Sequence, residues 1–296
     1  MKRSQPLPFT VQKYGRNVHV VKVYVASVAK SWKQRFLLMS DNHHDNLLCN
    51  QELEKKHLKE AKADNAGILF FGDLFCAMQG KWDKRADQDQ LREELRGNDY
   101  LNLLVDYAKE FFLPYSKNII MIGYGNHETK LEEKHGFDII ADLVARLNER
   151  SGSNITTGGY SGYVKFEFIF ASSNAHASKL LWYHHGSGGN APVTKGVLQT
   201  ARHAAFLTDA DIVVSGHNHN EFIFPITRIR LNKQYHIEKS RQLHVKIPGY
   251  KDGFADGAKG WENQKGFSPT SCGSCWLEFT ADRERNIYVE PQLTLR

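Results

Sequence analysis

Residues 35–45 read RFLLMSDNHHD, and this stretch decides the expected fold class. The run Arg35–Ser40 is largely apolar and continuous, which is typical of a strand buried on both faces of a parallel sheet. Asp41 and His43 follow it at once. In open α/β sheets, ligands bind where the carboxyl ends of the strands release their loops. The stretch therefore predicts a buried parallel strand that brings polar ligands to one edge of a sheet.

Four more apolar runs end in the same kinds of side chain. They are GILFF (67–71) before Gly72-Asp73, NIIMI (118–122) shortly before Gly125-Asn126-His127-Glu128, KLLWY (179–183) before His184-His185, and ADIVVS (210–215) before Gly216-His217-Asn218-His219. Carboxylate, imidazole and amide oxygen are ligands that suit zinc, manganese, iron, nickel or cobalt. Because parallel strands release their loops at one edge, the five clusters predict a metal centre there.

Each cluster also has an ordinary explanation when it is taken alone. An Asp after a strand often forms a turn or caps a helix, and a His-Asn-His sequence is often a surface loop. Five such clusters at the ends of five different predicted strands are hard to attribute to unrelated turns. A carboxylate can bridge two cations, and two metals about 3.5–4 Å apart activate water and stabilise a phosphoryl transition state. We therefore predict a dimetal site.

The segments between the apolar runs predict the rest of the architecture. Helical spacing of apolar residues predicts helices over 47–63, 89–112, 137–150 and 200–207, with a break at Gly97-Asn98 as an alternative within the second. Strands alternating with helices favour a parallel sheet with right-handed crossovers, and the β-rich stretch 221–296 favours a second sheet packed on the first. No linker divides the chain, so we expect one domain over residues 1–296, whose C-terminal part completes the second sheet.

The composition excludes several classes of protein. The chain is 41% hydrophobic and 24% charged, which is ordinary for a folded globular protein and not for a disordered or fibrous one. No apolar run approaches the ~18–20 residues of a membrane helix, and residues 1–20 carry no signal pattern. We therefore expect a cytoplasmic protein without a membrane partner. Four scattered cysteines are no disulfide framework, and the pair Cys272 and Cys275 lacks the second pair of a zinc ribbon.

In order and content, the five clusters resemble the motifs of the calcineurin-like metallophosphoesterases: D-x-H, G-D, G-N-H-E, a strand-end His and G-H-x-H. The resemblance spans roughly residues 35–220. It implies an α/β fold, a four-layer α/β-β/α sandwich of two mixed sheets with flanking helices. It also implies a dimetal site at the carboxyl ends of the strands.

Carried over residue by residue, the resemblance implies a ligand set for two metals. One metal would be held by Asp41, His43 and His219, and the other by Asn126, His217 and one of His184 and His185, with Asp73 bridging both. Relatives with His-Gly at the fourth motif suggest His185, whereas relatives with His-x-Pro suggest His184. Successive side chains of a strand point to opposite faces, so only one can be the ligand, and we expect His185.

The resemblance also implies a reaction, the hydrolysis of a phosphate mono- or diester. Two divalent ions, with manganese expected first and iron, zinc, nickel or cobalt as alternatives, would activate a bridging water. His127 would act as the general acid near the leaving group. The chain departs from the family at Cys76, where a second carboxylate often stands (G-D-x-x-D). That departure puts fine positioning in doubt and not metal binding.

Substrate contacts and substrate class are less constrained. Lys84 and Arg85, in the basic segment 79–85, could grip a phosphate, or they could belong to a solvated charged loop. A DNA nuclease of the same superfamily is the alternative function, favoured by the net charge of +6 and by the basic stretch 228–241. A non-catalytic scaffold that has lost its metals is a third possibility, against which the intact ligand set argues.

Overall fold

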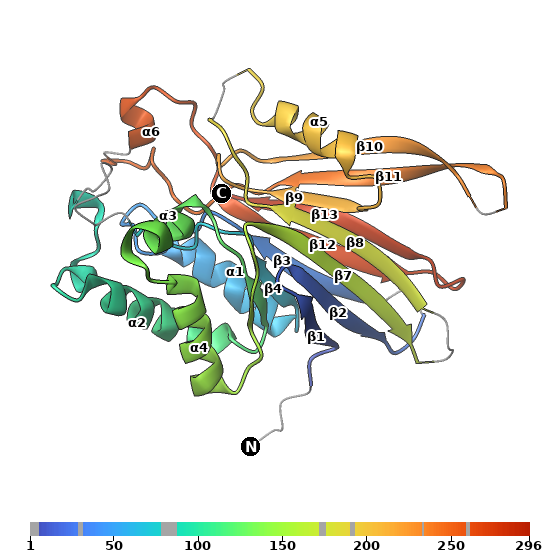
Figure 1. The fold of residues 1–296 in the computed structure, drawn as a ribbon, viewed down its shortest axis with the longest axis horizontal. Coiled ribbons are helices and arrows are strands. Elements are labelled where there is room, and N and C mark those ends of the chain that lie inside the picture. The colour runs from blue at the N-terminus through green and yellow to red at the C-terminus, as the bar shows by residue number, and fades with distance from the viewer. Residues whose placement is uncertain are drawn as a thin grey trace.

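The computed structural model describes residues 6–28, 32–77, 88–171, 176–189, 193–232, 234–258 and 261–296. Two mixed β-sheets pack against each other, and helices flank them (Figure 1). The first sheet has the strand order β1-β2-β7-β8-β9-β11-β10, and the second has the order β13-β12-β3-β4-β5-β6. This arrangement confirms the expected sandwich of two mixed sheets with flanking helices.

Each sheet contains a run of neighbouring parallel strands, which in the second sheet extends to its edge at β6. The first sheet contains β1 (Phe9–Gly15), β2 (Val18–Val25), β7 (Ser161–Phe170), β8 (His176–His184), β9 (Ile212–Ser215), β10 (Phe222–Leu231) and β11 (Ile237–Lys246). The second contains β3 (Lys33–Met39), β4 (Gly67–Phe70), β5 (Ile119–Ile122), β6 (Thr156–Thr157), β12 (Gly273–Ala281) and β13 (Ile287–Leu295). Strands β3 to β6 pair in parallel, as do β8, β9 and β11. The strands after residue 221 divide between the two sheets.

Among the described residues, five helices lie between successive parallel strands, and a sixth, short helix lies between β11 and β12. They are α1 (Gln51–Ala63), α2 (Tyr100–Phe112), α3 (Asn126–His135), α4 (Ile139–Ser151), α5 (Val197–Phe206) and the short α6 (Trp261–Gln264). The helical segment predicted over 89–112 is divided near Gly97, as the alternative of a break at Gly97-Asn98 allowed: two 3-10 turns, Gln88–Gln90 and Glu93–Leu95, precede α2. Gly97 separates them from α2, because glycine is a poor helix former. In the described part of the chain, no helix is both long and apolar enough to cross a membrane.

Buried apolar clusters on both faces of the sheets explain why the central parallel strands are apolar throughout. Phe36, Leu38 and Leu69 face the other sheet, where the ring centroid of Phe36 lies 4.8 Å from that of Phe166. Their neighbours in sequence point the opposite way and pack under α1, α2 and α4, as the side chain of Phe70 does. A strand buried on both faces needs apolar residues at every position. The continuous runs in the sequence therefore mark the strands that carry the polar loops.

Candidate metal centre

The loops after β3, β4, β5, β8 and β9 meet at one edge of the sandwich. The Asp41 N–H donates to the Gly72 carbonyl at 3.0 Å, which links the loops after β3 and β4. The Gly216 N–H donates to the His185 carbonyl at 2.8 Å, which links the loops after β9 and β8. The two sheets are joined where the His217 N–H donates to Asp41 Oδ2 at 2.8 Å, across 176 positions of sequence. Five distant segments of the chain thus form one small region.

The first group of possible ligands comprises Asp41, His43 and His219, whose ligand atoms lie within 4.8 Å of one another. His43 Nε2 lies 3.3 Å from His219 Nε2, and the two rings are stacked. His219 Nε2 lies 3.7 Å from Asp41 Oδ1. Two imidazole nitrogens bound to one cation at a near-tetrahedral angle lie roughly 3.4 Å apart. The spacing of the two rings therefore suits a shared cation.

One oxygen of Asp41 supports this interpretation. Oδ2 accepts hydrogen bonds from the Ser40 hydroxyl at 2.6 Å and from the His217 N–H. Oδ1 is buried and has no hydrogen-bond partner within the described residues. A buried carboxylate oxygen without a partner is unfavourable unless a cation or a donor meets it. The residues present therefore fit a bound cation at this position.

The second group comprises Asp73, His185 and His217, and Asn126 lies against it. Asp73 Oδ2 lies 3.2 Å from His185 Nε2. His185 donates its Nδ1–H to the Phe71 carbonyl at 3.0 Å, so its Nε2 is the atom that faces the centre. Asn126 Oδ1 lies 2.7 Å from His217 Nδ1 and 3.3 Å from His185 Nε2. Oxygen and nitrogen donors of this kind converge on one point, as ligands of a cation would.

His217 lies between Asn126 and the loop after β8. Its Nδ1 lies 2.7 Å from Asn126 Oδ1, and its Nε2 lies 3.0 Å from the Gly188 carbonyl. Both partners are oxygen atoms, so a neutral ring can donate to only one of them and keeps a lone pair on its other nitrogen. Imidazole nitrogen and amide oxygen are both ligands that suit a transition metal. The position of His217 therefore fits a bound metal.

Charge and burial set the protonation of the metal-free centre. Burial lowers the pKa of His43 well below its usual value, and the neighbouring His127 and His219 lower it further. Burial also opposes a charge on His185, but the Asp73 carboxylate outweighs it and raises the pKa of His185 to about 9. The pKa of Asp73 is held well below its usual value, because His185 and His127 outweigh the effect of burial. His43 is therefore neutral, and His185 carries a proton that a cation would replace.

The backbone is strained at the predicted ligands. Positive φ angles occur at Asp41 (52°), His43 (47°), Asp73 (49°), His217 (80°) and His219 (55°). This left-handed region is uncommon for residues with a Cβ, and such strain persists only where the surroundings enforce it. At two neighbouring positions only glycine fits, because the backbone lies against a carboxylate of the site. A Cβ on Gly125 would lie 2.1 Å from Asp73 Oδ1, and a Cβ on Gly216 would lie 2.3 Å from Asp41 Oδ2.

The two adjacent histidines lie on opposite sides of β8. His185 is fully buried and faces Asp73. His184 instead lies against Trp182 and against His203 of α5, with ring centroids 5.6 Å away in both cases. Its Nδ1 accepts a hydrogen bond from the Gly186 N–H at 2.9 Å. Burial lowers the pKa of His184 to about 4, so the ring is neutral. The structure brings His185 into the centre and leaves His184 outside it.

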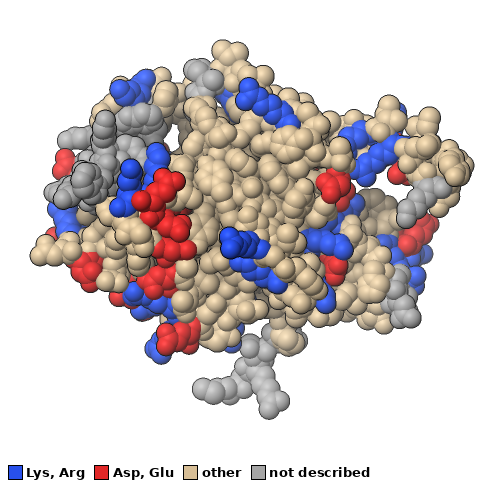
Figure 2. Space-filling model, in the orientation of Figure 1, with Lys and Arg blue, Asp and Glu red and all other residues tan. Residues whose placement is uncertain are grey.

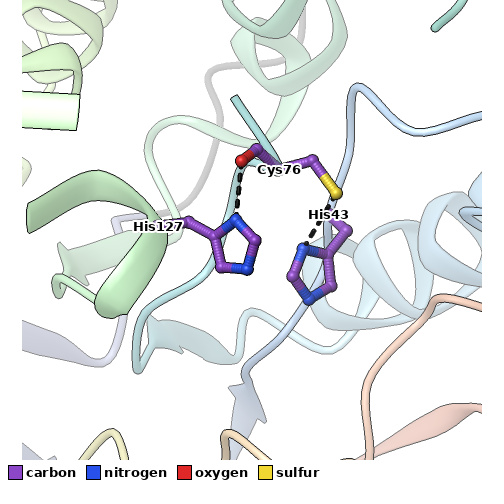
Figure 3. Close-up of side chains that lie close together, drawn as sticks. All are labelled: His43, Cys76 and His127. Atoms are coloured by element: carbon purple, nitrogen blue, oxygen red, sulfur yellow. Dashed lines mark hydrogen bonds between the residues drawn. The ribbon is translucent and has the colours of Figure 1, made fainter. Parts of the chain in front are cut away.

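His127 lies at the start of α3, beside the centre. Its backbone N–H donates to Asp73 Oδ1 at 2.9 Å, and its Nε2 lies 3.8 Å from Asp73 Oδ2. Its Nδ1–H donates to the Cys76 carbonyl at 2.6 Å, as Figure 3 shows. The ring is therefore held close to the metal ligands. It belongs to neither the group around Asp41 nor the group around Asp73, but its ligand atom lies within 4.8 Å of those of His43 and Cys76.

Glu128 is a residue of this region whose role the sequence did not indicate. Its carboxylate is buried and accepts hydrogen bonds from the N–H groups of Gly125, Asp73 and Phe75, at 2.8, 3.1 and 3.0 Å. Burial, and then the nearby charge of Asp73, raises the pKa of Glu128 to about 8. Its position three residues after Gly125 is the signal of a capping box, which could have revealed it. Glu128 joins the loop of Asp73 to the start of α3.

Two predicted substrate contacts and the cysteine of the second motif remain to be placed. Lys84 and Arg85 lie outside the described residues. Cys76, which replaces the second carboxylate of the motif, places its Sγ 3.3 Å from His43 Nδ1. A separate buried group, His44, Cys49 and Glu54, packs under α2. There His44 Nδ1 lies 2.8 Å from Glu54 Oε2, so this group is satisfied by its own hydrogen bonds.

No family model matches the chain, and no curated protein matches it. Solved structures that match include Vps29 of Chaetomium thermophilum, at 10% identity over 91% of this chain and 97% of that chain, with a TM-score of 0.37. GAP50, the anchor in the inner membrane complex of Plasmodium, matches at 12% identity over 89% of each chain, with a TM-score of 0.35. A hypothetical protein from Thermus thermophilus matches at 9% identity over 90% of this chain and 100% of that chain, with a TM-score of 0.36. Values this low carry no inference about function.

Proposed function

We propose that this protein is a metal-dependent phosphoesterase with two divalent cations, of which manganese is the first candidate. Asp41, His43 and His219 would hold one cation, and Asn126, His185 and His217 would hold the other, with Asp73 shared between them. The observation that carries the proposal is the convergence of both groups at one sheet edge, with Asp41 Oδ1 buried and unpartnered in the described structure. Bound divalent cations would lower the pKa of a water molecule and share the charge of a phosphoryl group.

The chain itself supplies a proton donor to this reaction. The Cys76 carbonyl keeps a proton on Nδ1 of His127, so Nε2 is the atom free to carry a second proton. Nε2 faces Asp73 and therefore the region where substrate would bind. In its protonated form, Nε2 can give its proton to the oxygen of the leaving group. A general acid of this kind contributes about 10²–10⁴-fold, and most when the leaving group is poor.

The test of the proposal combines metal analysis with kinetics. The purified protein should bind two divalent ions per chain and hydrolyse nitrophenyl phosphate, its bis ester or a nucleotide ester when manganese is added. His127→Asn should keep its metals and its fold. It should lose far more kcat/KM on an alkyl or nucleotide ester than on the nitrophenyl ester, because nitrophenolate departs without a proton.

Two results would contradict the proposal. A wild-type protein that binds no metal and cleaves no ester of the panel would be a scaffold and not an enzyme. An equal loss on both kinds of ester in the metal-loaded His127→Asn protein would leave hydrolysis intact but remove the general-acid role.

A DNA nuclease is the second candidate, and the charge of the chain favours it. The net charge is +6, and Arg228, Arg230, Lys239 and Arg241 lie on the long ribbon of β10 and β11 (Figure 1). On the face drawn in Figure 2, however, described basic and acidic side chains gather in separate small groups of both signs. Salt-dependent binding and cleavage of DNA would identify a nuclease. Cleavage of small esters without DNA binding would leave the first candidate.

A further inference from the structure

A second aspartate, Asp45, lies just behind the proposed site, and the loop after β4 rests on it. Its Oδ1 accepts a hydrogen bond from the Cys76 N–H at 2.5 Å, and its Oδ2 accepts one from the Ala77 N–H at 2.9 Å. The Tyr100 hydroxyl also donates to Oδ2, at 3.1 Å. Asp45 is only 2% exposed, so these bonds are sheltered from water. The carboxylate thus holds two consecutive peptide N–H groups at once.

These two hydrogen bonds determine where the Cys76 carbonyl points. That carbonyl and the Ala77 N–H belong to one planar trans peptide group, in which the C=O and N–H bonds point in opposite directions. Because the Ala77 N–H points at Asp45, the carbonyl points away from it. It meets Nδ1 of His127 at 2.6 Å. Ala77 has a φ of 47°, a left-handed conformation that alanine rarely adopts without such restraint.

The carbonyl in turn decides which nitrogen of His127 carries the first proton. A carbonyl oxygen can only accept, so Nδ1 must be protonated for this hydrogen bond to form. The other nitrogen, Nε2, is left facing Asp73 Oδ2 at 3.8 Å. The backbone N–H of His127 is fixed separately, by Asp73 Oδ1. The ring therefore has one orientation and one tautomer.

Cys76 occupies the position at which the family often has a carboxylate, but its side chain makes its hydrogen bonds to residues other than His127. Its Sγ lies 3.3 Å from His43 Nδ1 and accepts a hydrogen bond from Asn46 Nδ2 at 3.3 Å. Only its carbonyl reaches His127, as Figure 3 shows. The carboxylate that acts on Nδ1 of His127 in this structure is therefore that of Asp45, through the Cys76–Ala77 peptide group.

We propose that Asp45 is a positioning residue for His127. Its carboxylate holds the Cys76–Ala77 peptide so that the Cys76 carbonyl keeps the proton on Nδ1 and directs Nε2 toward the site. The catalytic consequence rests on the proposed phosphoesterase function. The effect on the tautomer of His127 does not rest on that function, because it depends only on the hydrogen bonds among Asp45, the Cys76–Ala77 peptide and His127.

Asp45→Asn is the variant that tests the proposal. In Asp45 each peptide N–H is bound by a different oxygen. An asparagine replaces one of these oxygens by an NH2 group that can only donate, so one N–H loses its acceptor and the peptide is free to turn. Tyr100→Phe is the matched control, since it removes one hydrogen bond from the same buried carboxylate and leaves both peptide N–H groups bound. Metal content and thermal melting are measured on both variants first.

The first readout is the tautomer of His127, measured by nitrogen-15 NMR of histidine-labelled protein. His127→Gln assigns the signal by its disappearance, and the zinc-loaded protein avoids paramagnetic broadening. We expect the Nδ1–H form in the wild type and in Tyr100→Phe, and a shift toward the Nε2–H form in Asp45→Asn. A wild-type signal of the Nε2–H form would overturn the proposal without any Asp45 variant, even if Asp45→Asn does not fold.

The second readout is kinetic. Asp45→Asn should lower kcat on an alkyl ester by about 10- to 100-fold, the loss expected when a reacting group is misplaced by an ångström or less. KM and metal content should stay as in Tyr100→Phe, and the nitrophenyl ester should be affected less. An Asp45→Asn protein with the tautomer and kcat of the control would refute the role of Asp45. A wild type without esterase activity would refute the proposed function alone, because the NMR result would still decide the role of Asp45.

Discussion

Replacing Asp73 by Asn in the metal-free protein should remove a pH dependence of stability that arises from one buried ion pair. Asp73 Oδ2 lies 3.2 Å from His185 Nε2, and the two side chains are 3% and 0% exposed. The carboxylate raises the pKa of His185 from 6.5 to about 9. At about 1.4 kcal/mol for each pKa unit, this shift corresponds to roughly 3 kcal/mol of stabilisation by the proton.

The sign follows from the direction of the shift. The pKa of His185 is higher in the folded state than in the unfolded state, so the folded protein binds the proton more tightly. The stabilisation is fully present below pH 6.5 and is lost as the pH rises through 9. Glu128 acts in part of the same range: its pKa is raised from 4.5 to about 8, so its contribution is lost between those values.

The assay is urea denaturation of chelator-treated protein at several pH values between 6 and 10. The wild-type free energy of unfolding should fall by about 1.4 kcal/mol per pH unit from the His185 proton alone, with Glu128 adding to the fall below pH 8. Glu128→Gln should keep the His185 part of the slope, and Asp73→Asn should flatten it. The slope is the readout, so a general loss of stability in the variant does not obscure the result.

A wild-type slope that persists in Asp73→Asn between pH 8 and 9 would refute the reasoning, since Asp73 would then not be what holds the proton on His185. The same pair has a consequence for metal uptake. A cation bound at His185 Nε2 must displace that proton, so metal binding should release protons and grow tighter as the pH rises toward 9.

Three further outcomes are expected. Asp73→Asn should lower the affinity for both metals, whereas Asp41→Asn should mainly weaken one; elemental analysis checks this, and two metals with full activity in the Asp73 variant would exclude a bridging role. His185→Ala should lose metal and activity together, whereas His184→Ala should mainly lower the melting temperature; the reverse pattern would move the ligand to His184. Gly125→Ala should reduce metal content with the fold retained by circular dichroism, because the added Cβ would meet Asp73 Oδ1 at 2.1 Å; an unchanged metal content would show that the loop can move aside.

The sequence by itself determined the type of fold and where its polar loops are. Strands buried on both faces need apolar residues at every position, so runs such as 67–71 and 210–215 mark the central parallel strands. The residues that follow them are local in sequence, and their chemistry can be read without the structure. The extent of the helix before Phe112 was harder to predict, because two short turns replace its first part. The places of β10 to β13 in the two sheets were also open, since strand pairing joins distant segments.

Only the tertiary structure decided the details of the candidate site. Alternation along β8 shows that His184 and His185 face opposite ways, but packing of His184 against Trp182 decides which of them faces Asp73. The partner of His127 could not be predicted, because it is a backbone carbonyl and every residue has one. The hydrogen bonds of Asp45 to the Cys76 and Ala77 N–H groups could not be predicted from the sequence either, since they depend on the path of the chain. The chemistry of each side chain follows from the sequence, whereas the direction of a peptide group is set only by the contacts around it.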